Sequence, residues 1–207
     1  MAAYIRPPIG ASAFRDADGQ VIPYGRRWRN GDPPEDSYSR VSHPERFAPL
    51  HQIAEALVRH LTADYDARSE DVPAPEGALR SIRLTPSGPD QAPLTFVFTD
   101  FPSVSIRAGL LHEQGFPSCG CDACDEDWRE PADELERLVL TVVAGGFAEW
   151  CRPGFGSRYG SSLESVDGSG SQRGETSARA VSAERFKAAR RRLRRLPDGW
   201  AAWSPKT

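Results

Sequence analysis

The sequence contains little cysteine, methionine or lysine, and it has no long apolar run. Among 207 residues there are four cysteines and one methionine, and Lys187 and Lys206 are the two lysines. Apolar residues make up 39% of the chain, below the share of about 45–50% that is usual in globular proteins. The longest apolar runs span only a few residues, whereas a membrane helix needs roughly 20. These absences exclude a helical membrane span and indicate a modest hydrophobic core.

The first residues and the cysteine content together indicate a compartment. The opening string MAAYIRPPIG contains no charged stretch followed by an apolar one, which is the pattern of a secretory leader. Cysteines in a chain without such a leader are more typical of reduced thiols or a metal site than of disulfides. We therefore expect a cytoplasmic protein that contacts no membrane.

Glycine and proline are abundant and set the organisation of the chain. Together they make up 18 + 18 = 36 of 207 residues, about 17% against a typical share near 12%. This composition excludes a coiled coil, a repeat array and a collagen-like chain. At this length we expect a single domain over residues 1–207, with a loop-rich segment at 1–40 and a Gly/Ser-rich loop at 154–174.

Apolar periodicity predicts three helices. Spacings of 3 and 4 residues run over 43–66, where Ser42 and Glu45 fit a capping box. A second apolar face covers 131–150. The third helix, expected at 182–196, carries a narrow apolar stripe surrounded by arginines.

Strict alternation of apolar and polar residues predicts strands with one solvated face. Such runs occur at 82–84, 94–98 and 104–108, and a small hairpin is expected at 14–24. The fold class is therefore α+β: an antiparallel meander packed by the helices at 43–66 and 131–150, with a basic helix near the C-terminus.

Charge is unevenly distributed, although the net charge is only 26 − 29 = −3. Residues 113–136 contain nine acids and one base, which gives −8. Residues 179–195 contain eight bases and one acid, which gives +7. We expect the two segments to neutralise each other in part, because oppositely charged segments of one chain often face each other.

Three of the four cysteines lie within six residues, at Cys119, Cys121 and Cys124. Thiolates are strong zinc ligands, and a Cys-x-Cys-x-x-Cys loop can wrap three sulfurs around one ion at about 2.3 Å each. A structural site needs a fourth ligand, and we favour His112, which precedes the loop at the end of a predicted strand. Asp122, Asp125 or a residue remote in sequence are alternatives. Cys151 is disfavoured, because it follows a helix expected to be about 30 Å long.

Two catalytic interpretations of these cysteines are weaker. A redox Cys-x-x-Cys needs a stabilised thiolate, whereas Cys121 and Cys124 are surrounded by acids at 122, 125, 126 and 127. A zinc deaminase needs His-x-Glu well upstream of Pro-Cys-x-x-Cys, but here Glu113 follows His112 at once. Reduced structural thiols remain the main alternative to a metal site.

The cysteine loop also carries a family resemblance. The string FPSCGCDACDE at 116–126 follows APLTFVFTDFPSVSIRAG and precedes an acidic helix and a Trp-rich tail. This arrangement resembles a family of unknown function from high-GC bacteria with a CGCDAC core motif. The resemblance covers most of the chain and supports the single-domain interpretation, but it implies no activity.

Three functional hypotheses follow. The first is a non-catalytic, zinc-stabilised intracellular domain that acts through contacts with a protein partner. The second is a nucleic-acid-associated protein that uses the arginine-rich helix over 185–195, whose guanidinium groups suit phosphates. The third is a small metalloenzyme, which would need an open coordination position in a cleft.

Overall fold

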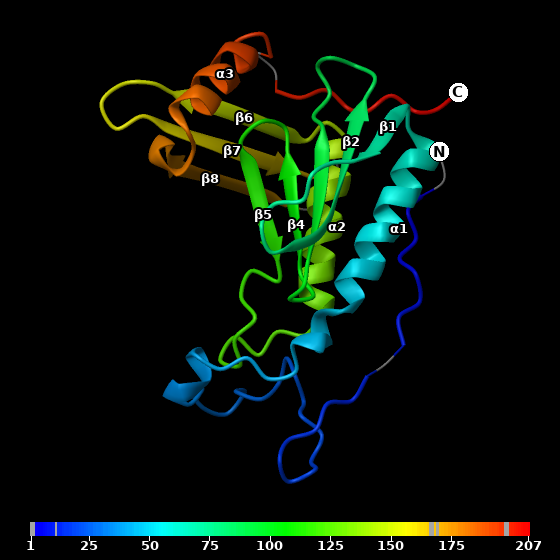
Figure 1. Ribbon diagram of the computed structural model, residues 1–207, viewed down its shortest axis with the longest axis vertical. Coiled ribbons are helices and arrows are strands. Elements are labelled where there is room, and N and C mark those ends of the chain that lie inside the picture. Colours follow the sequence, from blue (N-terminus) through cyan, green and yellow to red (C-terminus); the bar gives the residue numbers. More distant parts are fainter. Residues whose placement is uncertain (1–2, 11, 166–167, 169, 197–198) are drawn as a thin grey trace.

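The computed structural model describes residues 3–10, 12–165, 168, 170–196 and 199–207 (Figure 1). Its elements are, in chain order, η1 (Glu35–Tyr38), η2 (Pro44–Phe47), α1 (Pro49–Asp64), β1 (Ala67–Asp71), β2 (Ala78–Pro86), β3 (Leu94–Thr99), β4 (Val104–Ala108), β5 (His112–Phe116), α2 (Arg129–Val143), β6 (Phe147–Arg152), β7 (Arg158–Glu164), β8 (Ser171–Ser177), η3 (Ala178–Ala180) and α3 (Ala183–Leu193). The η elements are short 3-10 helices. No helix of the described residues has the length and apolar content needed to cross a membrane.

The first sheet is the predicted meander. Its five strands follow the order β1-β2-β3-β4-β5, and each neighbouring pair is antiparallel. The alternation in β4 is present as expected, because Val104, Ile106 and Ala108 are buried while the two residues between them are partly exposed. The α+β class with an antiparallel meander is therefore confirmed.

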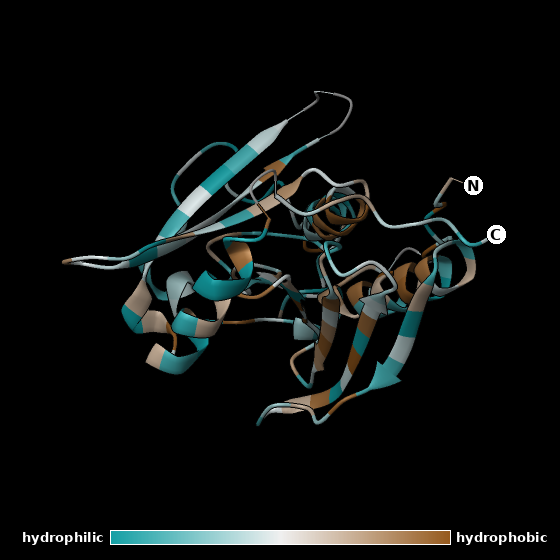
Figure 2. Cartoon of the chain, turned by 90° about the horizontal axis from the view of Figure 1, so that it is seen from above, coloured by the Kyte–Doolittle hydropathy of each residue, from teal (hydrophilic) through white to brown (hydrophobic). Residues whose placement is uncertain are grey.

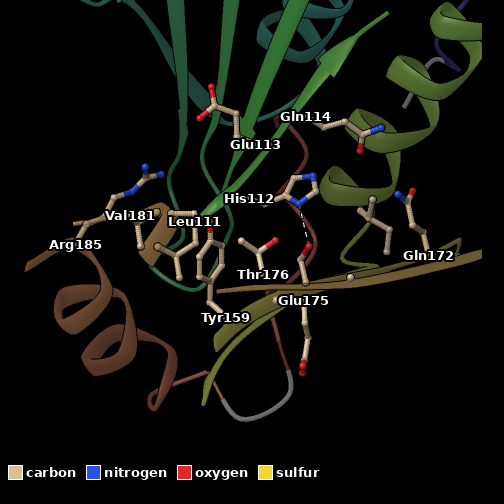
Figure 3. Close-up of a pocket in the computed structure, with 15 residues that line it drawn as sticks. Leu111, His112, Glu113, Gln114, Tyr159, Gln172, Glu175, Thr176, Val181 and Arg185 are labelled. Carbon is tan, nitrogen blue, oxygen red and sulfur yellow. Dashed lines mark hydrogen bonds between the residues drawn. The ribbon is translucent and has the colours of Figure 1, made fainter. Parts of the chain in front are cut away.

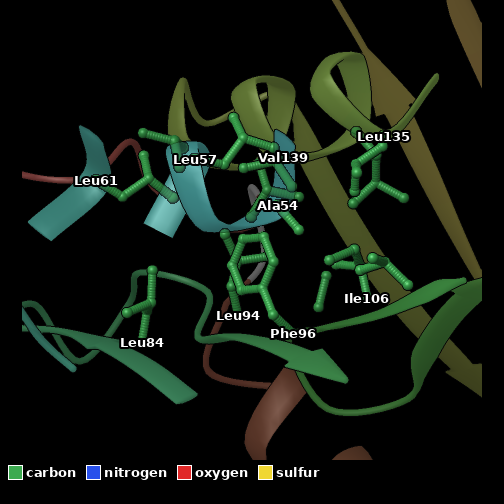
Figure 4. Packing of buried hydrophobic residues seen from close by; sticks show 14 of the residues in the cluster. Ala54, Leu57, Leu61, Leu84, Leu94, Phe96, Ile106, Leu135 and Val139 are labelled. Carbon is green, nitrogen blue, oxygen red and sulfur yellow. The ribbon is translucent and has the colours of Figure 1, made fainter. Parts of the chain in front are cut away.

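Helices α1 and α2 lie side by side on one face of this sheet and form the core with it (Figures 1 and 4). Side chains from both helices meet those of the inner strands and have no exposed surface: Leu57, Leu61, Phe96, Ile106, Leu135 and Val139. Burial of each such side chain stabilises the fold by about 1.5–3 kcal/mol. The apolar periodicity thus identifies the two core helices correctly.

The start of the first helix differs from the prediction. Helix α1 begins at Pro49, because Pro44–Phe47 form a separate 3-10 helix and His43 has a left-handed φ of 51°. Ser42 does not cap a helix. Its N–H and hydroxyl instead donate to the Asp122 carboxylate at 2.9 and 2.7 Å. The capping-box prediction is wrong, because a distant carboxylate takes the donors of Ser42.

The chain after α2 departs most from the prediction. Helix α2 ends at Val143 rather than near 150, because Gly145 turns the chain with a φ of 84° and a Cβ there would lie 2.7 Å from the backbone N of Ala202. Strand β6 follows, and the expected loop at 154–174 contains β7 and part of β8. These three strands form a second antiparallel sheet in the order β6-β7-β8. Serines and glycines interrupt any apolar alternation in β7 and β8, so these two strands leave little trace in the sequence.

Helix α3 lies against β6 (Figure 1). It begins as predicted, with the Ser182 hydroxyl accepting the backbone N–H of Arg185 at 3.2 Å. Its apolar stripe is only partly covered, since Ala189 is buried while Phe186 and Leu193 are half-buried.

Candidate metal centre

The three clustered cysteines bring their sulfurs together. The Sγ atom of Cys121 lies 3.3 Å from that of Cys119 and 3.5 Å from that of Cys124. All three sulfurs lie within 4.8 Å of one another, and the described residues contain no other group of three or more Cys, His, Asp or Glu donors this close. Zinc–sulfur bonds of about 2.3 Å in a tetrahedron separate the sulfurs by about 3.8 Å. The cluster is therefore close to the size of a three-thiolate zinc site.

Hydrogen bonds from the N-terminal segment hold this loop through Asp122. The Asp122 carboxylate is buried and accepts from Ser42 and from Nε of Arg40 at 2.9 Å. Its backbone N–H donates to the Arg40 carbonyl at 2.8 Å. Its carbonyl accepts from Nη2 of Arg27 at 2.7 Å and from Nε1 of Trp28 at 3.1 Å. Asp122 thus orients the loop and is not placed as a metal ligand.

Asp125 makes a second contact with the same segment. Its carboxylate accepts from the backbone N–H of Arg27 at 2.7 Å and forms an ion pair with the Arg27 guanidinium. Its carbonyl accepts from the N–H of Gly25 at 2.6 Å. The left-handed φ of 55° at Asp125 turns the chain at the end of the loop. Both alternative aspartate ligands are therefore engaged with arginines, and neither belongs to the sulfur cluster.

Arg46 joins the two ends of the loop from inside the molecule. Its side chain is nearly fully buried, and it donates to the carbonyls of Gly120 at 2.8 Å and Glu126 at 3.0 Å. The guanidinium stacks on the rings of Tyr24 and Phe47, 4.5 and 4.3 Å from their centroids. No carboxylate of the described residues pairs with it, and burial lowers its pKa.

The cysteine loop is less negatively charged in its surroundings than its acidic residues alone indicate. Asp122 and Asp125 are each paired with arginine, and Arg46 adds a positive charge without a carboxylate partner. The guanidinium groups of Arg27, Arg40 and Arg46 thus offset part of the negative charge of these acids near the sulfurs. The acids at 122 and 125 therefore oppose thiolate formation far less than their number in the sequence indicates.

The cysteine thiols differ from one another in acidity. Burial raises the pKa of Cys121, but the backbone N–H of Cys124 and hydrogen bonds with the thiols of Cys119 and Cys124 bring the pKa below the ordinary thiol value. Hydrogen bonding to Cys119, together with burial, raises the pKa of Cys124 to about 12. The Cys121 sulfur thus shares hydrogen bonds with both neighbouring thiols, and a metal ion that bound there would displace the thiol protons.

His112, the favoured fourth ligand, is not part of the cluster. It lies at the first residue of β5, whereas the cysteine loop follows the last, about 13 Å away at 3.3 Å per residue. Its Nδ1 is 2.9 Å from the Ser161 hydroxyl, and its ring packs on Phe147 at 5.6 Å. Burial lowers the His112 pKa. The structure thus separates His112 from the three sulfurs.

The surroundings of His112 form a cavity of about 380 Å³ between the two sheets (Figure 3). Strand β5 lies on one side, β7 and β8 on the other, and the residues before α3 close one end. Tyr159, Ser161 and Thr176 line it with hydroxyl groups, while Glu175 points away toward Arg152 and Arg158. None of the three clustered cysteines lines this cavity.

Cys151, the remaining cysteine, lies on β6, which follows α2. The argument from distance assumes a helix of about 30 Å before Cys151, whereas α2 ends at Val143 and is shorter. Among the described residues, Cys151 nevertheless lies outside the sulfur cluster. Sequence reasoning also missed Arg27, Arg40 and Arg46 as partners of the loop. Arginines spaced along 26–46 opposite the acids at 122–127 are the signal that indicates this docking.

Comparison with known proteins gives a family match that covers most of the chain. No curated protein matches the chain. A model described as a family of unknown function, DUF6226, matches residues 10–207, so the expected resemblance to such a family over most of the chain is confirmed. The chain belongs to this family of unknown function.

Proposed function

We propose that the protein binds one zinc ion through the thiolates of Cys119, Cys121 and Cys124, and that it acts as a zinc-stabilised intracellular domain through contacts with a protein partner. The observation that carries this proposal is the group of three sulfurs within 4.8 Å of one another. Thiolate ligands in this number favour zinc over magnesium or calcium, which prefer oxygen ligands.

The loop around the sulfurs supports a structural role for the ion. Its carboxylates, carbonyls and N–H groups bond to residues 25–46, so the metal would fix the loop and, through it, the irregular N-terminal segment. That segment contains only a 3-10 helix and the isolated bridge Arg15–Val21 over 3–40 of the described residues. A metal crosslink adds stability where regular hydrogen bonding is sparse.

The exposure of the site supports the proposed contacts with a protein partner. Cys124 is exposed, and Phe101, which touches the loop at Gly120, is 37% exposed. Three protein ligands leave one coordination position for a water molecule or for a ligand from a bound protein. A partner that covers the loop would bury Phe101 and close this position.

Two cysteine variants test the proposal against a matched control. Cys121→Ser removes the central sulfur, whereas Cys151→Ser removes a cysteine outside the cluster. We expect zinc titration under reducing conditions to give one tight site in the wild type and in Cys151→Ser, and to raise the melting temperature of both. Cys121→Ser should lose both effects. Equal zinc binding by the two variants, or a Cys121–Cys124 disulfide in the native protein, would contradict the proposal.

A further inference from the structure

The second sheet and α3 carry a positive charge that the rest of the chain lacks. Residues 147–196 contain 11 bases and five acids, which gives +6. The remainder contains 26 − 11 = 15 bases and 29 − 5 = 24 acids, which gives −9. Ten of the 11 bases are arginines, which bind phosphate groups through two parallel hydrogen bonds. We call the part of the fold formed by these residues the basic lobe.

The positive charge of α3 is not neutralised by the acidic segment at 113–136. Among the described residues, no ion pair includes a residue of α3. The acidic segment instead pairs with Arg6 through Glu136 at 2.6 Å and through Asp133. Figure 2 shows that β8 and much of α3 are hydrophilic. The expected mutual neutralisation of the two segments is therefore absent from the described structure.

A groove runs between α3 and β6 and collects part of this charge. Its volume is about 320 Å³, and Arg190 and Arg194 line it from successive turns of α3. Glu149, Cys151 and Pro153 line the opposite side, and Leu193 and Leu196 contribute apolar surface. The groove therefore combines two guanidinium groups with apolar surface, and a positively charged groove of this kind can follow the phosphates of a single strand.

An exposed aromatic side chain stands at the end of this lobe. Phe155 is fully exposed at the tip of the β6–β7 hairpin, which projects beside α3 (Figure 1). Gly154 and Gly156 flank it with φ angles of 136° and 71°. Of the described residues at 147–196, Phe155 is the one large apolar side chain that is exposed. Its ring offers a stacking surface for an unpaired base.

We infer that the basic lobe binds single-stranded nucleic acid, with backbone phosphates at Arg190 and Arg194 in the groove and a base stacked on Phe155. A duplex is disfavoured, because a single aromatic side chain stacks only on a base that is already unpaired. A lipid surface is disfavoured, because the single exposed ring of Phe155 buries far less apolar area than the acyl chain that accompanies a basic patch in stable membrane attachment. This inference is independent of the zinc site, which lies in another part of the fold.

Fluorescence anisotropy with a labelled 20-nucleotide single strand of mixed sequence tests the inference. We expect a dissociation constant below about 10 μM at 50 mM salt, and about four phosphate contacts would weaken binding about 50-fold at 200 mM salt. Arg190→Glu/Arg194→Glu should weaken binding at least tenfold and roughly halve the salt dependence. Phe155→Ala should weaken it severalfold, and Phe155→Trp should restore it.

The control is Arg59→Glu/Arg68→Glu, which changes the net charge equally at two exposed arginines outside the basic lobe. This control should bind like the wild type, and circular dichroism should show that all variants are folded. Several results would overturn the inference: no binding at 50 mM salt, equal loss in the control, tighter binding of a duplex of the same sequence, binding only to vesicles of anionic lipid, or salt-sensitive self-association in place of oligonucleotide binding.

Discussion

Removal of the Asp122 side chain should release the cysteine loop from the N-terminal segment. The carboxylate is 1% exposed and accepts three hydrogen bonds, two from Ser42 and one from Arg40. Asp122→Ala leaves these donors without an acceptor. Asp36→Ala is the matched control, because Asp36 pairs with the same arginine at 2.7 Å, but its side chain is 66% exposed.

The expected magnitude follows from burial. Ser42 donates two hydrogen bonds to the buried carboxylate, and a hydrogen bond to a charged group contributes about 1.5–3 kcal/mol, whereas an exposed ion pair contributes less than about 1 kcal/mol. Asp122→Ala should therefore destabilise the docked loop by about 3–4 kcal/mol. Asp36→Ala should destabilise it by only about a few tenths of a kcal/mol. A free-energy difference of about 1.4 kcal/mol changes an equilibrium constant tenfold. Asp122→Ala should therefore lower the equilibrium constant for docking of the cysteine loop by roughly two to three decades.

Amide hydrogen exchange measures this effect at the loop itself. The N–H groups of Asp122 and Ala123 donate to the carbonyls of Arg40 and Ser37, at 2.8 and 3.1 Å, so their protection reports docking directly. We expect protection at both amides to fall by roughly two to three decades in Asp122→Ala. Equal protection in Asp122→Ala and Asp36→Ala would refute the claim that the buried carboxylate anchors the loop.

Three further changes should give measurable effects. Glu149→Ala should lower the free energy of unfolding in urea by about 3–5 kcal/mol, because it leaves the buried N–H groups of the β4–β5 turn and of Trp200 without an acceptor. The control Glu164→Ala, at an exposed position, should lower it by less than about 0.5 kcal/mol. Burial holds the pKa of His112 below its unfolded value near 6.5. The contribution of the neutral His112 to stability is therefore present above that pH and is lost as pH falls. Between pH 7.5 and pH 5, the melting temperature of His112→Asn should fall less steeply than that of the wild type. Ser182→Ala should destabilise α3 by about 1 kcal/mol through loss of its N-cap, measured as faster amide exchange in the first turn; exchange unchanged from the wild type would show that the cap contributes nothing.

The predictable part of the fold is the part held by apolar periodicity. The inner strands and the two core helices place apolar side chains at regular intervals, so the pattern at 94–98 and 104–108 predicts strands that the structure contains. In the second sheet, β7 and β8 contain several serines and glycines and pair through their backbones, so side-chain periodicity gives no signal for them. The end of α2 depends on a close approach of Gly145 to the C-terminal tail, a contact between residues far apart in the sequence.

The candidate site, like the fold, has a part that the sequence predicts and a part that it does not. The spacing of Cys119, Cys121 and Cys124 identifies the sulfur cluster, because all its members lie on one short loop. The assignment of His112 depended on its nearness in sequence, and an extended strand carries that residue away from the loop. The role of Ser42 likewise depends on Asp122, 80 residues away, and no local pattern reveals such a contact.

The metal content of protein purified without added zinc tests the central claim most directly. Elemental analysis by mass spectrometry should find about one zinc per chain in the wild type and in Cys151→Ser. It should find almost none in Cys121→Ser. Wild-type protein that contains no metal and keeps its full melting temperature in a strong chelator would contradict the account.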